Sequence, residues 1–345
     1  MDEAARQTRT HLIALFKEHG VHPRTMFGQN FLIDLNIVES IVRAADLEGR
    51  DGRDVVLEIG AGTGGMTTFL AAGAARVISV EIDNAMFAMA KQMTAGLDHV
   101  QMIHGDALRN KNNFSDELLE TVSRTVAEVP DGRLKLVANL PYNVATPIIS
   151  NLIASDLPWR KQVVTIQYEL GLRLVAGPGS SHYGSLSVWA QANSHVKLLR
   201  KLPPTVFWPR PKVTSAVMRL DRNYKGQKTI LDRVFFQDYQ RRVFQPRRKL
   251  IRGVLAGMYR KQIGKEAVTD VLEHMGREAN DRAEQLTVEE HIELGNALWL
   301  ASEGQPLPPR DGAGDDVGDE VPSDDAPGDD AHDAPEAAAA ASAEP

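Results

Sequence analysis

Five short apolar runs alternate with helical patterns over the first half of the chain, and this alternation limits the fold more than any other feature. The runs are DVVLEI (54–59), RVISVEI (76–82), VQMIH (100–104), RLKLVAN (133–139) and QVVTIQ (162–167). Strands that alternate with helices are typical of a parallel sheet with helices on both faces. The first half of the chain is therefore predicted to be an α/β domain.

Two later apolar runs extend the predicted sheet. HVKLLRKL (195–202) and VTSAVMRL (213–220) are separated by the proline-rich connector PPTVFWPRPK (203–212). Because no long crossover helix fits in the connector, the two strands are expected to pair antiparallel. We therefore predict a Rossmann-like sheet of seven strands with one antiparallel strand.

The remaining segments differ in composition from this domain. After about residue 228 helical periodicity replaces the strand-like runs, which predicts a small all-α domain. From residue 303 Asp, Pro, Gly and Ala predominate, and a segment with so little apolar surface to bury is expected to be disordered. The predicted organisation is an N-terminal helical extension (1–23), a Rossmann-like domain (24–222), a helical domain that docks RNA (229–302) and an acidic tail (303–345).

The net charge of −7 averages two oppositely charged parts of the chain. Residues 303–345 hold thirteen acids against one arginine, a net charge of −12, so residues 1–302 carry +5. Between residues 197 and 261, eighteen Lys and Arg stand against three Asp, a net charge of +15. A surface of this charge density attracts a polyanion, and an ordinary solvated face is the alternative.

Other features exclude several classes of protein. The absence of cysteine rules out disulfides and cysteine-bound metals and is compatible with the cytoplasm. The histidines show no metal-binding spacing, and no apolar run approaches the roughly 20 residues of a membrane span. We therefore expect a cytoplasmic protein that binds neither a metal nor a membrane. We also expect it to be a monomer.

Three polar sites follow the first three strands and fit an adenosyl ligand. Gly60 and Gly62, in EIGAGTGG (58–65), let a ligand approach the backbone at a helix N-terminus. Glu81 ends the second strand and can accept hydrogen bonds from ribose hydroxyls, whereas Asp106 can accept one from an adenine amino group. The glycine spacing also occurs in dinucleotide sites, but the three sites together favour S-adenosylmethionine over NAD.

A fourth site, Asn139-Leu140-Pro141-Tyr142, ends the fourth strand. The amino nitrogen of adenine is a poor nucleophile because its lone pair is delocalised into the ring. If the Asn139 side-chain oxygen and the Leu140 carbonyl accept its two hydrogens, that lone pair becomes available to a methyl group. Pro141 stiffens the turn and Tyr142 can stack on the purine. The alternative is an ordinary Asx turn before a helix.

Together these stretches resemble the ribosomal RNA adenine dimethyltransferase family, in order, over about residues 24–301. The matching motifs are FGQNFL (27–32), EIGAGTG (58–64), VEID (80–83), GDA (105–107), NLPYN (139–143), FWPRPKVTSAV (207–217) and RAEQLTVEEH (282–291).

The resemblance implies an S-adenosylmethionine-dependent enzyme that dimethylates two adjacent adenosines of small-subunit ribosomal RNA in a pre-ribosomal particle. It implies that Asn30 and Leu32 close over the methionine end of the cofactor. It also implies that Asn139 contacts both ligands and that Phe207 faces Tyr142 across the target base. Two alternatives remain open: an enzyme that methylates large-subunit RNA and confers antibiotic resistance, and a non-catalytic RNA-binding assembly or transcription factor.

Basic residues in two stretches are predicted to contact RNA phosphates. One stretch is the proline-rich connector, and the other is FQPRRKLIRGVL (244–255), where positive charge at a helix start opposes the helix dipole and indicates a partner. The predicted RNA-binding residues are Arg210, Lys212, Arg247, Arg248, Lys249 and Arg252.

Overall fold

The computed structural model describes residues 9–23, 28–246, 249–277 and 280–302. The predicted acidic tail, Arg247 and Arg248 lie outside the described residues. Within those ranges no helix has the length and apolar character to cross a bilayer. In the same part of the chain, no group of three or more His, Asp or Glu side chains is arranged to hold a metal ion.

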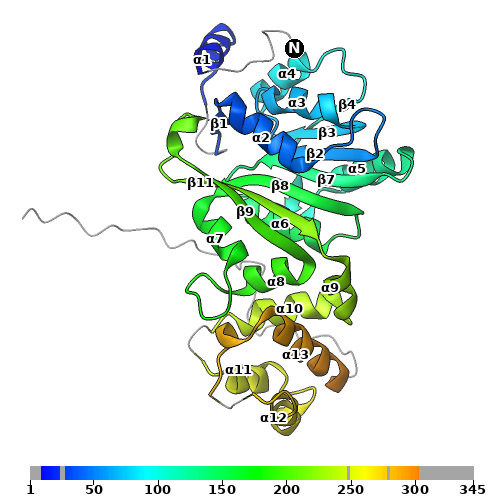
Figure 1. The fold of residues 1–345 in the computed structure, drawn as a ribbon, viewed down its shortest axis with the longest axis vertical. Helices are drawn as coiled ribbons and strands as arrows, with labels where there is room; N and C mark the ends of the chain where they lie inside the picture. The colour runs from blue at the N-terminus through cyan, green and yellow to red at the C-terminus, as the bar shows by residue number, and fades with distance from the viewer. Residues whose placement is uncertain (1–8, 24–27, 247–248, 278–279, 303–345) are drawn as a thin grey trace, which may run out of the picture. The chain divides into compact units, whose positions relative to one another are not determined.

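A seven-stranded sheet in the order β4-β3-β2-β7-β8-β11-β9 forms the core of the fold (Figure 1). β11 runs antiparallel to both of its neighbours, and the other paired strands are parallel. The prediction of seven strands with one antiparallel strand is confirmed. The strands are β2 (Asp54–Ile59), β3 (Arg76–Glu81), β4 (Val100–His104), β7 (Arg133–Asn139), β8 (Trp159–Gln167), β9 (Ser194–Leu202) and β11 (Ser215–Arg222).

Helices cover both faces of this sheet, which explains why its central strands are buried on both faces and largely apolar. β2, for example, is buried along its whole length. Side chains of several helix-capping residues accept backbone hydrogen bonds, as Asp83 does from Ala85 and Met86. One face carries α2 (Leu35–Ala45), α3 (Gly65–Gly73) and α4 (Asn84–Met93); the other carries α5 (Asp116–Glu128), α6 (Ala145–Ala154), α7 (Tyr168–Val175) and α8 (Ser185–Asn193).

Two short antiparallel ribbons accompany the sheet, and neither is apparent from apolar periodicity. β1 (Phe31–Leu32) pairs with β10 (Phe207–Trp208), which follows the 3₁₀ turn Pro204–Val206 in the proline-rich connector. β5 (Leu108–Asn110) pairs with β6 (Asn113–Phe114). The first ribbon joins segments that are far apart in the sequence at the edge where the predicted site lies.

The chain after β11 is helical in its described residues, as expected. α10 and α13 both pack against α8 of the sheet layer (Figure 1). Near the N-terminus, α1 (Arg9–Glu18) lies in the segment 1–23 that is predicted to be a helical extension. The division into separate domains remains a prediction. The later helices are α9 (Tyr224–Thr229), α10 (Arg233–Val243), α11 (Ile251–Met258), α12 (Gly264–His274) and α13 (Val288–Ala301), with a 3₁₀ turn at Ala283–Gln285.

Candidate active site

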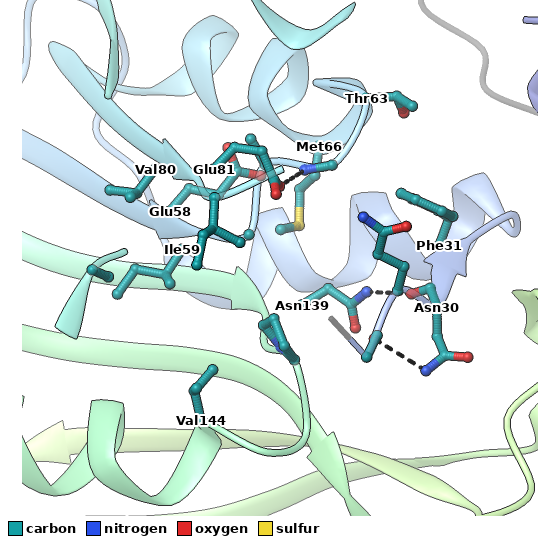
Figure 2. Close-up of a pocket in the computed structure, with 18 of the residues that line it drawn as sticks. Asn30, Phe31, Glu58, Ile59, Thr63, Met66, Val80, Glu81, Asn139 and Val144 are labelled. Atoms are coloured by element: carbon teal, nitrogen blue, oxygen red, sulfur yellow. Dashed lines mark hydrogen bonds between the residues drawn. The ribbon is translucent and has the colours of Figure 1, made fainter. Parts of the chain in front are cut away.

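A cavity of about 330 Å³ lies at the carboxyl ends of β2, β3 and β7 (Figure 2). This is the edge at which open α/β sheets bind ligands, and the size is at the low end of small-molecule sites. The predicted residues that line the cavity are Asn30, Leu32, Gly60, Gly62, Glu81, Asp106, Asn139 and Pro141. Leu140, Tyr142 and Phe207 are not among its described lining residues.

The glycine turn after β2 depends on the absence of side chains. Gly60 and Gly62 have φ of +83° and +57°, in the left-handed region that favours glycine. A Cβ on Gly62 would lie 2.9 Å from the Phe31 ring, and one on Gly60 would lie 3.2 Å from Pro141. Because Gly60 and Gly62 have no side chains, their turn can pack against both Phe31 and Pro141 and still leave the cavity open. This fits a ligand that lies against the backbone.

Two predicted acids present acceptor oxygens at the neighbouring strand ends. Glu81 is 6% exposed, and its Oε2 accepts a hydrogen bond from the Gly62 amide (2.7 Å). Its Oε1 accepts from the Asp83 amide (2.9 Å). Burial raises the pKa of Glu81, and the two oxygens together keep acceptor capacity for a hydroxyl donor. Asp106 is exposed, and its Oδ1 accepts from the Leu108 amide (2.8 Å). Its Oδ2 can accept from an amino group.

Glu58 also lines the cavity, although the sequence interpretation did not single it out. Its Oε2 accepts hydrogen bonds from the Thr67 and Ser79 hydroxyls, both at 2.6 Å. Its Oε1 is buried and has no hydrogen-bond partner among the described residues. Burial, together with the nearby Glu81, raises the pKa of Glu58 to about 7 against the effect of the two hydroxyls. A cationic ligand group would favour the ionised form of this carboxyl.

Asn139 is held in one orientation at the end of β7. Its Nδ2 donates to the Asn30 carbonyl (2.8 Å), and the Asn30 side chain in turn donates to the Gly28 carbonyl (3.2 Å), as Figure 2 shows. With its nitrogen used as a donor, the Asn139 amide keeps Oδ1 as an acceptor. The Leu140 amide donates to the Thr165 carbonyl (3.1 Å), which ties the following peptide to β8.

Tyr142 and Phe207 lie outside the cavity wall for different reasons. The Tyr142 hydroxyl is 2.6 Å from Ser215 Oγ at the buried start of β11. Burial raises the pKa of the Tyr142 phenol. Phe207 is 3% exposed and packs in the hydrophobic core with Leu202 and Val217. Its predicted place opposite Tyr142 therefore remains a prediction, whereas Ser215 is a contact that the sequence interpretation missed.

The predicted RNA-binding residues lie on two different elements. Arg210 and Lys212 are exposed between β10 and β11. Lys249 is exposed just before α11, and Arg252 is half-buried in the first turn of that helix. The Arg252 Nε is buried and has no hydrogen-bond partner among the described residues. The roles of these residues remain predictions.

Comparison with known proteins gives consistent matches over most of the chain. The profile of the family described as "Ribosomal RNA adenine dimethylase" matches residues 20–296. The chain is 38% identical over 301 residues to "Ribosomal RNA small subunit methyltransferase A" of Moorella thermoacetica, covering 86% of this chain and 99% of the relative. The protein of that name in Halothermothrix orenii is 34% identical over 273 residues, which cover 79% and 87% of the two chains.

Two solved structures resemble this fold. A dimethyladenosine transferase from Plasmodium falciparum has a TM-score of 0.64 at 23% identity and covers 78% of this chain and 97% of its own. The 23S rRNA methyltransferase ErmE has a TM-score of 0.56 at 22% identity, with coverage of 78% and 99%. At these identities the likeness shows the shared fold.

Proposed function

Because the chain belongs to the ribosomal RNA adenine dimethylase family, we propose that it methylates the exocyclic amines of two adjacent adenosines in small-subunit ribosomal RNA, with two methyl groups per base. The observation that carries the proposal is the Asn139 amide, fixed by the Asn30 carbonyl at the wall of the cavity. The two relatives at 34% and 38% identity are named for the small subunit, which favours it over the large subunit.

The donor is S-adenosylmethionine, which supplies an activated methyl group on its sulfonium when bound. The Gly60–Gly62 turn would hold it against the backbone, Glu81 would accept from its ribose hydroxyls and Asp106 from its adenine amino group. Asn30 and Leu32 would close the opposite wall. The left-handed glycines and the free acceptor capacity of both acids support this assignment.

The chain's own contribution to the reaction is to orient the target amine. Asn139 Oδ1 and the Leu140 carbonyl accept the two amine hydrogens and direct the nitrogen lone pair toward the methyl group. The Tyr142 ring stacks on the target adenine, while its hydroxyl is anchored at Ser215. The Nδ2 of Asn139 donates to the Asn30 carbonyl and the amide of Leu140 donates to the Thr165 carbonyl, so both residues are held in place. Little reorganisation is therefore needed at the moment of transfer.

The proposed substrate determines the proposed partners. We place the enzyme, as a monomer, on a pre-ribosomal particle in the cytoplasm, where the basic residues of the connector and of α11 contact RNA phosphates. Exposed Arg210, Lys212 and Lys249 support this docking, because phosphate contacts need accessible cations.

The deciding experiment incubates the protein with labelled S-adenosylmethionine and under-methylated small ribosomal subunits, followed by mapping of the modified bases. We expect label on two adjacent adenosines of small-subunit RNA. Label on large-subunit RNA in a parallel incubation would favour the resistance-type enzyme. Binding of subunits without any binding of cofactor would favour a non-catalytic RNA-binding protein.

Because the Tyr142 hydroxyl contacts Ser215, the role of the Tyr142 ring can be tested separately from the role of its hydroxyl. Tyr142→Phe should slow single-turnover methylation only about 2- to 10-fold, because it removes one anchoring hydrogen bond and keeps the ring. Ser215→Ala should have a similar effect, and the double variant should be no slower than either single variant. Tyr142→Ala should be far slower. If the phenylalanine variant is as inactive as the alanine variant, the hydroxyl has a role in the reaction itself.

RNA docking through the basic residues should depend strongly on salt. We expect the logarithm of the affinity for small subunits to fall linearly with the logarithm of salt concentration. Lys212→Ala should reduce the slope by about one, because one phosphate contact is lost. The control is Lys91→Ala, which removes an exposed lysine of α4 in the non-basic part of the chain and should leave the slope unchanged. A flat salt response of the wild-type protein would contradict the proposed phosphate docking.

A further inference from the structure

Helix α1 lies outside the residues that match the family profile, which begins at residue 20. It has ten residues, and a helix of this length is marginal on its own. Leu12 and Phe16 are its buried side chains, with exposed fractions of 0% and 3%. Docking of this one face therefore holds α1 in place.

Phe16 belongs to a cluster of three aromatic rings. Its ring centroid lies 5.4 Å from that of Phe31, nearly edge-on at 68°, and 5.2 Å from that of Trp208. Phe31 and Trp208 are 6.5 Å apart and lie on the paired strands β1 and β10. Met86 and Met89 of α4 complete the cluster. Phe16 thus packs against both strands of the β1–β10 ribbon.

Phe31 connects this cluster to the cavity. It lines the cavity wall, as Figure 2 shows, and its ring approaches Gly62 so closely that a Cβ there would be only 2.9 Å away. The preceding residue, Asn30, supplies the carbonyl that accepts from the Asn139 amide. A shift of the Phe31 ring would therefore displace both the cavity wall and the partner of Asn139.

We propose that Phe16 is a positioning residue of the cofactor site, which fixes Phe31 and, through the adjoining backbone, the carbonyl that orients Asn139. Phe16 is not among the described residues that line the cavity, so it acts through Phe31. Helix α1 then contributes to the geometry of the cofactor site. This inference rests on the proposed function, because the ligand is taken to be S-adenosylmethionine.

The test is a calorimetric titration of full-length Phe16→Ala with S-adenosylmethionine. Removal of two aromatic contacts should weaken cofactor binding roughly 10- to 100-fold, while affinity for small subunits stays within about twofold of wild type. The matched control is Ile13→Ala, which changes a 41%-exposed residue of the same helix and should bind the cofactor as the wild type does. Phe16→Leu fills part of the space without a ring and should be intermediate.

Wild-type cofactor affinity in a folded Phe16→Ala variant would overturn the inference. An equal loss of cofactor and subunit binding would also overturn it, because that pattern means general loss of structure. Melting temperatures measured without cofactor show whether each variant is folded. If Phe16→Ala does not fold, Phe16→Leu decides: wild-type affinity overturns the inference and weakened affinity supports it. Failure of the wild-type protein to bind cofactor would instead refute the proposed function.

Discussion

Replacement of Asn139 by alanine should slow methylation about 100- to 1000-fold, or about 3 to 4 kcal/mol, at saturating cofactor. The substitution removes the acceptor that is proposed to orient the target amine, while the exposed cations of the docking surface are unchanged. Binding of small subunits should therefore survive, and cofactor affinity should fall only modestly. Single-turnover methylation and subunit binding, measured in parallel, separate the two effects.

Asn139→Asp provides the matched control. Aspartate keeps an acceptor oxygen at this position but loses the Nδ2 donor, which lies 2.8 Å from the Asn30 carbonyl. Its rate should lie between those of the wild type and the alanine variant, because the acceptor remains but is less well oriented. A near wild-type rate for Asn139→Ala would show that residues 139–142 form only a turn and that the proposed mechanism is wrong.

Below pH 6.5 the protein should lose stability because one buried histidine, His291 of α13, becomes costly to keep neutral. Its Nε2 faces the Ala283 carbonyl (2.9 Å), which can only accept, so Nε2 carries the proton. Nδ1 then accepts from the Tyr239 hydroxyl (2.9 Å). Burial lowers the pKa of His291 to about 4, and the charge of Arg277 acts in the same direction, against the Ala283 hydrogen bond.

The lowered pKa sets the direction of the pH effect. Between pH 6.5 and 4 the unfolded chain binds a proton at this position and the folded protein does not, so the free energy of unfolding falls as the pH falls. The contribution of His291 amounts to about 3 kcal/mol over that range. Denaturant titrations from pH 7 to pH 4 measure it.

His291→Gln removes the titrating group while leaving an acceptor oxygen and a donor NH₂ group on the side chain. The variant should be less stable than the wild type near pH 7, because its hydrogen bonds fit less well. Its free energy of unfolding should also fall less steeply as the pH falls. The slope that remains comes from other titrating groups. Identical slopes for the two proteins would contradict the assignment of this effect to His291.

The fold could be predicted from the sequence because its signals are local. The period and spacing of the apolar runs indicated the seven strands and the antiparallel pairing of the last two, but not that β11 lies between β8 and β9. The predicted cofactor residues at the ends of β2, β3 and β7 also meet at one cavity, because parallel strands present their carboxyl ends at the same edge.

The contacts that the sequence did not indicate join segments that are far apart in the chain. Tyr142 and Ser215 are 73 residues apart, and their pairing follows from the insertion of β11 beside β8. The burial of Phe207 was not indicated either, because a two-residue strand has no periodicity; its role in stacking on the target base remains a prediction. Glu58 did leave a signal, because a buried acid within a largely apolar strand is usually paired or functional.

The position of β11 in the sheet also affects the order in which the fold can form. β9 lies at the edge, and among the described strands its sheet partner is β11, which comes later in the chain. A nascent chain that ends near residue 212 therefore contains β9 but not the strand that joins it to β8. The pairing of β11 with β8 is non-local, with Ser215 opposite Gln167, and such pairing is slow because a long loop must close first. During synthesis, the anchor of Tyr142 at Ser215 is consequently one of the last contacts of the sheet edge to become available.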